Sequence, residues 1–191
     1  MKTATAAALA LAIVPLAACT TMTDAGAQTA SATTMVGGAA MYPSRNIIEN
    51  AVNSRDHTTL VAAVKAAGLV ETLSGPGPFT VFAPTNDAFA KLPAGTVDTL
   101  LQPANLATLR AVLTYHVLPG RVTSADLLRL IKAGGGQARL TTVQGGQLTA
   151  SVRDGGVILT DAKGGVAHVS QADVMQSNGV IHVTDAVSLP G

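Results

Sequence analysis

The chain is poor in charged and aromatic side chains and has a single cysteine. Of its 191 residues, 12% are charged and 3% are aromatic, and tryptophan is absent. An average soluble domain carries about 25% charged residues, so little charge is available here for electrostatic recognition. The single cysteine, Cys19, excludes an internal disulfide framework and a cysteine-based structural zinc site.

The charges are also balanced in sign, which argues against a nucleic-acid partner. The chain has 12 Lys and Arg side chains against 11 Asp and Glu, scattered along its length. DNA-binding proteins gather basic side chains on one face. We therefore expect no nucleic-acid partner, and the length predicts one main domain.

The N-terminus has the features of an export signal. Lys2 precedes a short apolar run from Ala4 to Leu16, which is shorter than the roughly 20 residues that a membrane-spanning helix needs. Residues 1–18 are therefore predicted to be a signal peptide. The run ends in Leu16-Ala17-Ala18-Cys19, which resembles the bacterial lipobox, in which the cysteine becomes the lipidated first residue. Cleavage after Ala25-Gly26-Ala27, with loss of Cys19, is the alternative.

A lipid on Cys19 would place the protein in the cell envelope. Thr20, rather than Asp, follows the cysteine, and by resemblance to Gram-negative lipoproteins this points to the outer membrane, facing the periplasm or the cell surface. Removal of Lys2 lowers the basic count from 12 to 11, equal to the 11 acidic side chains. A neutral mature protein does not attract a charged partner over long distances.

Residues 19–41 are predicted to be a flexible tether and residues 42–191 to be one folded domain. The tether is rich in Thr, Ala and Gly and shows no sustained apolar periodicity. In the domain, helical spacing of apolar residues follows Ser44, Asp56, Thr85 and Thr123 and also spans residues 100–113. A short buried strand is predicted over residues 79–83.

After residue 136 the apolar period changes from helical to alternating. Strands are predicted over residues 137–143, 147–153, 157–160, 166–175 and 180–189, separated by glycine pairs and by Asn178-Gly179. Helices followed by an antiparallel set of strands predict an α+β fold rather than a parallel sheet of βαβ units.

Three stretches make the chain recognisable. They are Thr80-Val81-Phe82-Ala83-Pro84-Thr85-Asn86-Asp87-Ala88-Phe89, Tyr115-His116-Val117-Leu118-Pro119-Gly120 and Asn178-Gly179-Val180-Ile181-His182-Val183-Thr184-Asp185. In this order and at these separations they resemble the fasciclin domain, over residues 46–190. The resemblance implies N-terminal helices packed on a wedge of mostly antiparallel sheet. It also implies a role in adhesion or in binding extracellular polymers.

The resemblance also implies candidate contact residues. In animal members a Tyr-His pair and a second segment are proposed integrin contacts; Tyr115-His116 matches the first and Asp173-Val174-Met175 matches the second. Two positions depart, because Gln171 replaces an acid and Ala172 replaces a proline. The alternative is that Asp173 only caps a turn beside Asn178-Gly179.

His116 is predicted to be a buried, hydrogen-bonded histidine rather than a ligand or catalyst, since buried polar groups are nearly always paired. By resemblance, Asn86 or Asp87 is its expected partner, and these three residues form the predicted polar core.

The sequence offers no pattern typical of an enzyme. It has neither a Gly-x-Ser-x-Gly nucleophile motif nor a Gly-Lys pair for a phosphate loop, and its histidines lack metal-ligand spacing. We expect no catalysis, no cofactor and no bound metal. The leading interpretation is a monomeric, lipid-anchored adhesion module for an unknown protein or polysaccharide. The alternative is a periplasmic carrier of an apolar small ligand, which a sizeable apolar cavity would favour.

Replacing the predicted lipidation site tests the anchor. Cys19→Ala removes the thiol that would carry the lipid, and two acyl chains hold a protein on a bilayer far more firmly than one. We expect the variant in unprocessed or soluble forms, whereas the wild type sediments with membranes. Mass spectrometry of the mature protein provides the check, and a lipid-free N-terminus at Gln28 contradicts the anchor.

Overall fold

Short helices build the first half of the domain, and side-chain caps set where several of them begin. The computed structural model describes residues 33–191. Asn46, Thr85 and Thr123 cap three helices by accepting a hydrogen bond from a backbone N–H of the first turn. The helices are α1 (Ile47–Ala51), α2 (Thr58–Ala66), α3 (Val70–Ser74), α4 (Asn86–Ala90), α5 (Thr96–Leu100), α6 (Leu106–Tyr115) and α7 (Ser124–Ala133), with 3-10 turns η1 (Arg55–His57) and η2 (Pro103–Asn105).

A seven-stranded sheet holds most of the remaining residues. Its order is β4-β3-β9-β8-β7-β6-β5, and every neighbouring pair is antiparallel except β3 and β9. The strands are β3 (Phe79–Pro84), β4 (Val117–Pro119), β5 (Gln137–Thr141), β6 (Gln147–Arg153), β7 (Gly156–Thr160), β8 (Val166–Gln176) and β9 (Gly179–Thr184). The fold is therefore α+β, as predicted.

The parallel pairing of β3 with β9 joins residues that are far apart in sequence. Phe79 pairs with Gly179, and the register continues to Pro84 and Thr184. The first and third recognisable stretches are thus neighbouring strands. The prediction of a mostly antiparallel sheet is confirmed, but it did not specify this parallel contact, because local alternation does not reveal a distant partner.

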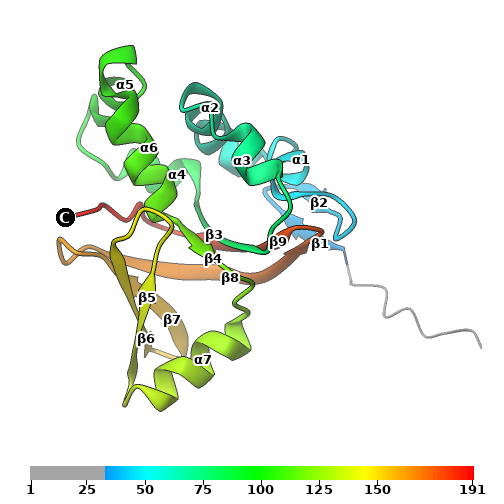
Figure 1. Ribbon diagram of the computed structural model, residues 1–191, viewed down its shortest axis with the longest axis vertical. Helices are drawn as coiled ribbons and strands as arrows, with labels where there is room; N and C mark the ends of the chain where they lie inside the picture. The colour runs from blue at the N-terminus through cyan, green and yellow to red at the C-terminus, as the bar shows by residue number, and fades with distance from the viewer. Residues whose placement is uncertain (1–32) are drawn as a thin grey trace, which may run out of the picture. The chain divides into compact units, whose positions relative to one another are not determined.

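Two hydrophobic cores lie on either side of the central strands. In Figure 1, α1–α6 lie above β3, β9 and β8, whereas α7 lies below them beside β5–β7. The first core, beneath the helices, includes Leu60, Val64, Val81 and Ile181. The second core packs α7 against β5–β7 and includes the rings of Phe82 and Tyr115.

The long strand β8 connects these two regions. Its first part pairs with β7 and its second part pairs with β9, with register shifts between Val169 and Gln171 and between Gln171 and Val174. An extra residue in a strand bends it and increases its twist. The bend lets one strand serve both cores.

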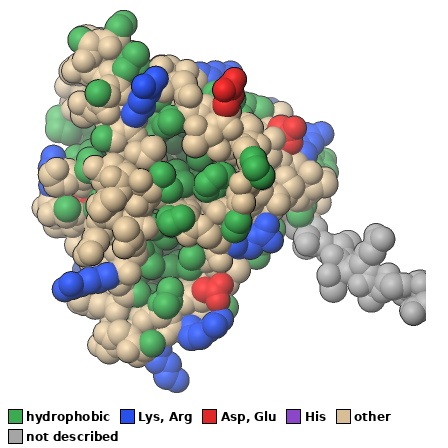
Figure 2. All heavy atoms as spheres, in the orientation of Figure 1, with side chains coloured by type: hydrophobic (Ala, Val, Ile, Leu, Met, Phe, Trp, Pro, Cys, Tyr) green, Lys and Arg blue, Asp and Glu red, His purple; other side chains and the backbone are tan. Residues whose placement is uncertain are grey.

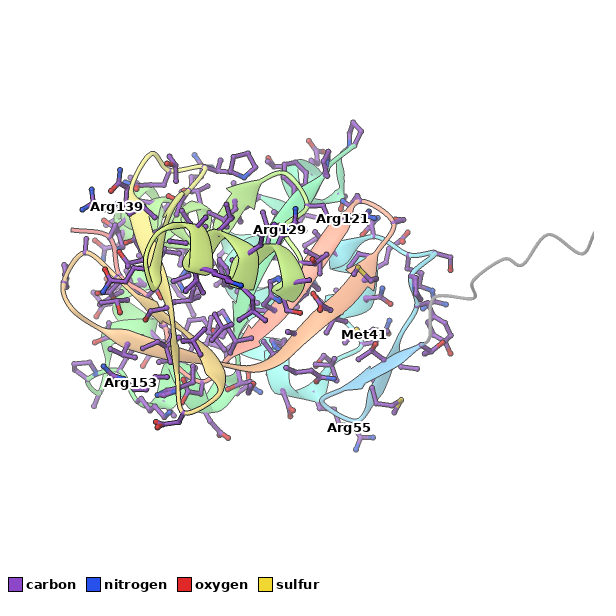
Figure 3. All side chains as sticks on the ribbon, turned by 90° about the horizontal axis from the view of Figure 1, so that it is seen from below. Met41, Arg55, Arg121, Arg129, Arg139 and Arg153 are labelled. Atoms are coloured by element: carbon purple, nitrogen blue, oxygen red, sulfur yellow. The ribbon has the colours of Figure 1, made fainter. Side chains whose placement is uncertain are left out.

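The predicted tether is wrong over its last residues. Residues 34–41 form a hairpin of β1 (Thr34–Val36) and β2 (Ala39–Met41), turned by Gly37 and Gly38 at positive φ. Val36 is 5% exposed and Met41 is 2% exposed, and Met41 lies between the hairpin and the sheet (Figure 3). The domain therefore begins before residue 42. The glycine pair was the signal that the composition of this segment obscured.

The predicted signal peptide, residues 1–18, and Cys19 lie outside the described residues. Between residues 33 and 191 no helix has the length and apolar character needed to cross a bilayer.

The hairpin should contribute to the stability of the domain. Met41→Ala removes a buried side chain from the first core and should lower the free energy of unfolding by about 2–5 kcal/mol. Met35→Ala, in the same hairpin but 58% exposed, should change it by less than about 0.5 kcal/mol. Denaturant unfolding of both variants is the measurement. Equal stabilities would show that the hairpin does not belong to the folded unit.

Candidate functional site

The segment Gln171–Met175 lies where β8 bends. Asp173 has a φ of 58°, the left-handed conformation that non-glycine residues rarely adopt. Its carboxylate reaches the start of α7, where it accepts hydrogen bonds from the backbone N–H of Ser124 at 2.7 Å and from the Ser124 hydroxyl. Asp173 therefore joins the bend of β8 to the first residue of α7.

The alternative prediction is that Asp173 only caps a turn beside Asn178-Gly179, but its carboxylate bonds to Ser124 at the start of α7 instead. Asn178 secures that turn itself. Its side-chain oxygen accepts from the N–H of Ile47 at 3.0 Å, and its amide group donates to the carbonyls of Leu73 and Gly75 at 2.8 and 3.0 Å. The turn is thereby tied to α1 and α3, and Asp173 is free to bind α7.

His182 completes the network around Asp173. The ring is fully buried in β9 and stacks on Phe82, with 5.6 Å between ring centroids. Its Nδ1 accepts from the N–H of Asp173 at 3.3 Å, and its Nε2 donates to the carbonyl of Val122 at 2.9 Å. Burial lowers the pKa of His182 below its ordinary value, while the carbonyl of Val122 and the charge of Asp173 partly oppose this shift.

His182 was missed as a site residue by sequence reasoning. The sequence placed it only within the third recognisable stretch and gave it no role. One signal was available in the sequence: apolar residues lie on both sides of His182, which favours a fully buried strand. The structure agrees, because every residue of β9 from Gly179 to Thr184 is buried.

Tyr115 and His116 are internal, so they do not offer the contact surface that the resemblance implied. The Tyr115 hydroxyl donates to the carbonyl of Gln147 at 2.6 Å and accepts from the N–H of Ala162 at 3.2 Å. His116 Nδ1 donates to the carbonyl of Val112 at 2.8 Å, and Nε2 accepts from the N–H of Ser188 at 3.0 Å. The pair anchors the end of α6 to the second core and to the C-terminal segment.

The predicted polar core of Asn86, Asp87 and His116 is not formed. Asn86 accepts from the N–H of Thr59 at 3.0 Å and donates to the carbonyl of Arg55 at 2.8 Å, whereas Asp87 is exposed. The Thr85 cap starts α4 next to α2, and His116 instead faces the C-terminal segment. Backbone groups, which a side-chain motif does not reveal, supply both partners of His116.

Part of the segment remains available to a partner. Val174 is buried, but Gln171, Ala172 and Met175 are half-exposed; we call these three residues the contact segment. The Gln171 side chain donates to the carbonyl of Met35 at 3.1 Å, which connects it to the β1–β2 hairpin. The contact segment is thus held between the hairpin, β9 and α7.

One exposed cation lies at the end of this region. Arg121 sits beside the β8–β9 hairpin (Figure 3) and donates to the carbonyls of Gln176 and Ser177 at 3.3 and 3.4 Å.

Catalytic and metal-binding groups do not converge in the described part of the chain. No three His, Cys, Asp or Glu side chains within residues 33–191 lie close enough to hold a metal ion. Ser54 and His57 form a hydroxyl–imidazole pair at 2.8 Å, the arrangement of an activated nucleophile. Both residues are buried, however, at 1% and 2% exposure, so the hydroxyl does not open onto the surface of the domain.

Comparison with known proteins identifies relatives of this chain in sequence and in fold. The family model of the fasciclin domain matches residues 55–190. Protein sll1483 of Synechocystis is 48% identical over 170 residues, covering 89% of this chain and 87% of that protein. Immunogenic protein MPB70 of Mycobacterium bovis is 33% identical, covering 96% and 90%. A solved FAS1 domain pair from the insect cell adhesion molecule fasciclin I superposes with a TM-score of 0.66 at 18% identity, over 75% of this chain and 50% of that one.

The bond between Asp173 and α7 should be measurable as stability. Asp173→Ala leaves the N–H of Ser124 without its acceptor, which should lower the free energy of unfolding by about 1–3 kcal/mol. Asp87→Ala, an exposed control, should cost well under 1 kcal/mol. Denaturant melts of both variants make the comparison, and a stable Asp173→Ala protein would contradict the assigned role.

Acid should destabilise the fold through its buried histidines. Burial lowers the pKa of His57, His116 and His182 below the ordinary value of about 6.5. The unfolded chain therefore binds more protons, so the free energy of unfolding is fully retained above pH 6.5 and falls as the pH drops below it. His182→Gln should reduce this pH dependence, whereas His168→Gln, at an exposed position, should not. Unfolding curves at pH 7.5 and 5.0 decide, and equal stability at both would be inconsistent with neutral buried rings.

Proposed function

The chain belongs to the fasciclin domain family, and from this membership we propose that it is a non-enzymatic adhesion module attached to the bacterial cell envelope through a lipid on Cys19. Residues 20–33 join the lipidated cysteine to β1. Adhesion is supported by the shared fold with a cell adhesion molecule, and the envelope location by the lipobox-like sequence ending at Cys19.

A hollow on the surface is lined by groups suited to binding rather than to catalysis. An open hollow of 490 Å³ is lined by Asn46, the loop of residues 74–78, Arg121, Ser177 and Asn178. None of these residues is a His, Cys, Asp or Glu, the groups that most often transfer protons or attack a substrate. The hollow can donate and accept hydrogen bonds, but it holds no acid–base pair.

The alternative of an apolar carrier is less well supported. The apolar cavity between the helices and the sheet has a volume of about 40 Å³. Sites that enclose drug-sized ligands measure roughly 300–1,000 Å³. A lipid or similar cargo does not fit into this space.

The observation that carries the proposal is the way the contact segment is held. Gln171, Ala172 and Met175 are half-exposed, while their neighbours Asp173 and Val174 are fixed by α7 and by the first core. A surface that is already ordered loses little conformational entropy on binding. The contact segment is therefore a pre-organised surface for a protein or polysaccharide partner.

Short-range contacts, rather than charge, suit such a partner. Figure 2 shows apolar side chains spread over one face of the domain, with fewer basic and acidic side chains, most of them near its margin. A surface of this kind binds by packing and hydrogen bonding, with little dependence on salt. We expect a monomer to be the binding unit.

The function is tested by measuring how tightly purified variants of the domain bind to intact bacterial cells. Met175→Ser should weaken attachment at least five-fold, the loss typical of a contact worth about 1 kcal/mol. Val152→Ser is the matched control, because Val152 is 46% exposed on β6 outside the contact segment. Both variants should keep the stability of the wild type.

Two outcomes are decisive. Equal attachment of Met175→Ser and wild type would contradict a role for the contact segment. Pretreatment of the cells with protease or with periodate separates the partner classes, since only a polysaccharide partner is lost on periodate oxidation and only a protein partner on proteolysis.

A further inference from the structure

A small, largely enclosed cavity lies in the first core. Its volume is about 40 Å³, and it sits between α1 and α2 on one side and β3 and β9 on the other. Aliphatic side chains such as Leu60, Val64 and Ile181 form most of its wall. Two histidine rings, His57 and His116, also line it.

One polar atom of this wall has no partner. Among residues 33–191, His57 Nε2 is the buried side-chain nitrogen or oxygen atom that forms no hydrogen bond of normal geometry, although the carbonyl of Ala83 lies near enough to act on the ring. The other ring nitrogen, Nδ1, is 2.8 Å from the hydroxyl of Ser54. His57 is 2% exposed, so bulk water does not compensate for the missing bond. Native proteins seldom leave a buried polar atom unpaired without a reason.

His116 cannot share this role. Both of its ring nitrogens are engaged by backbone groups, Nδ1 with Val112 and Nε2 with Ser188. The cavity therefore offers one hydrogen-bonding position, at His57. No Asp, Glu, Lys or Arg lines the wall, and burial lowers the pKa of His57 although the carbonyl of Ala83 opposes this. A ligand for such a site is uncharged.

We propose that the cavity is a binding site for a small uncharged molecule with a short aliphatic body and one hydroxyl group, hydrogen-bonded to His57 Nε2. A hydroxyl both donates and accepts, so it suits either tautomer of the ring. A cavity needs about 10–15 Å³ of volume to hold one water molecule, so a volume of about 40 Å³ limits the ligand to a few heavy atoms. Water itself needs two to four polar partners, and this wall provides one unpaired atom.

The β1–β2 hairpin provides the route into the cavity. Val36 and Met41 from the hairpin form part of the wall. The hairpin is attached by the bonds from Arg55 N–H to the Gly37 carbonyl and from Gln171 to the Met35 carbonyl. A two-stranded hairpin has little stability of its own, so a local opening of the hairpin can expose the cavity while the seven-stranded sheet stays folded. This opening uncovers Val36 and Met41 and therefore costs part of the stability that the hairpin contributes.

Ethanol and xenon are suitable probes for the full chain, because both are small and only ethanol forms hydrogen bonds. Nuclear magnetic resonance should show a saturable change of the His57 Nε2 signal on ethanol addition, with contacts from ethanol to the methyl groups of Val64 and Ile181. Small ligands bind weakly, so saturation is expected in the millimolar range.

Two variants separate the hydrogen bond from the space. His57→Phe keeps a ring but removes the acceptor, and it should weaken ethanol binding about ten-fold while leaving xenon binding unchanged. Val64→Leu adds volume to the wall and should weaken both probes, which keeps the test valid if His57→Phe does not fold.

Three results would overturn the proposal. They are a response to ethanol that rises linearly without saturation, equal ethanol affinity in the wild type and both variants, or a resident water at His57 that ethanol does not displace.

Discussion

β3 and β9 pair in parallel, and the rest of the structure is arranged around that pairing. The paired residues are 100 positions apart, as in Phe79 and Gly179. The pairing stacks His182 on Phe82 and brings the turn at Asn178 beneath α1 and α3. It also separates the two cores, because residues of β3 and β9 alternate between the helices above and the α7 side below. The first core includes residues of both strands, such as Val81 and Ile181.

The bend in β8 orders the segment that we propose as the binding surface. In a regular strand the N–H of Asp173 would bond to a neighbouring strand. The register shifts instead place its carboxylate against Ser124 and its N–H against the ring of His182. A left-handed backbone conformation is strained for a non-glycine residue and persists where surrounding contacts hold it. Two such contacts are present here. The half-exposed neighbours of Asp173 thereby obtain a defined position without being buried.

Sequence reasoning recovered the local elements better than the long-range ones. β6, Gln147–Arg153, was predicted with its observed bounds because glycine turns flank an alternating run. The β1–β2 hairpin was missed because few bulky residues mark it. His116 is buried and hydrogen-bonded, as predicted. Its partners, the bonds of Asp173 and the parallel pairing were missed for a different reason. Most of them join groups that are distant in sequence, such as His116 with Ser188 and Asp173 with Ser124, and a local sequence motif does not specify such partners. The resemblance implied a contact role for Tyr115, but the motif does not show whether the side chain is exposed, and the ring is buried.

Hydrogen exchange at the amide of Asp173 tests the account most directly. This N–H lies in a half-exposed segment at an irregular point of a strand, where rapid exchange is expected unless something holds it. Its bond to the buried His182 predicts protection as strong as that of the β9 amides, lost only with global unfolding. Exchange at the rate of an exposed loop would contradict the claim that His182 and α7 fix the contact segment.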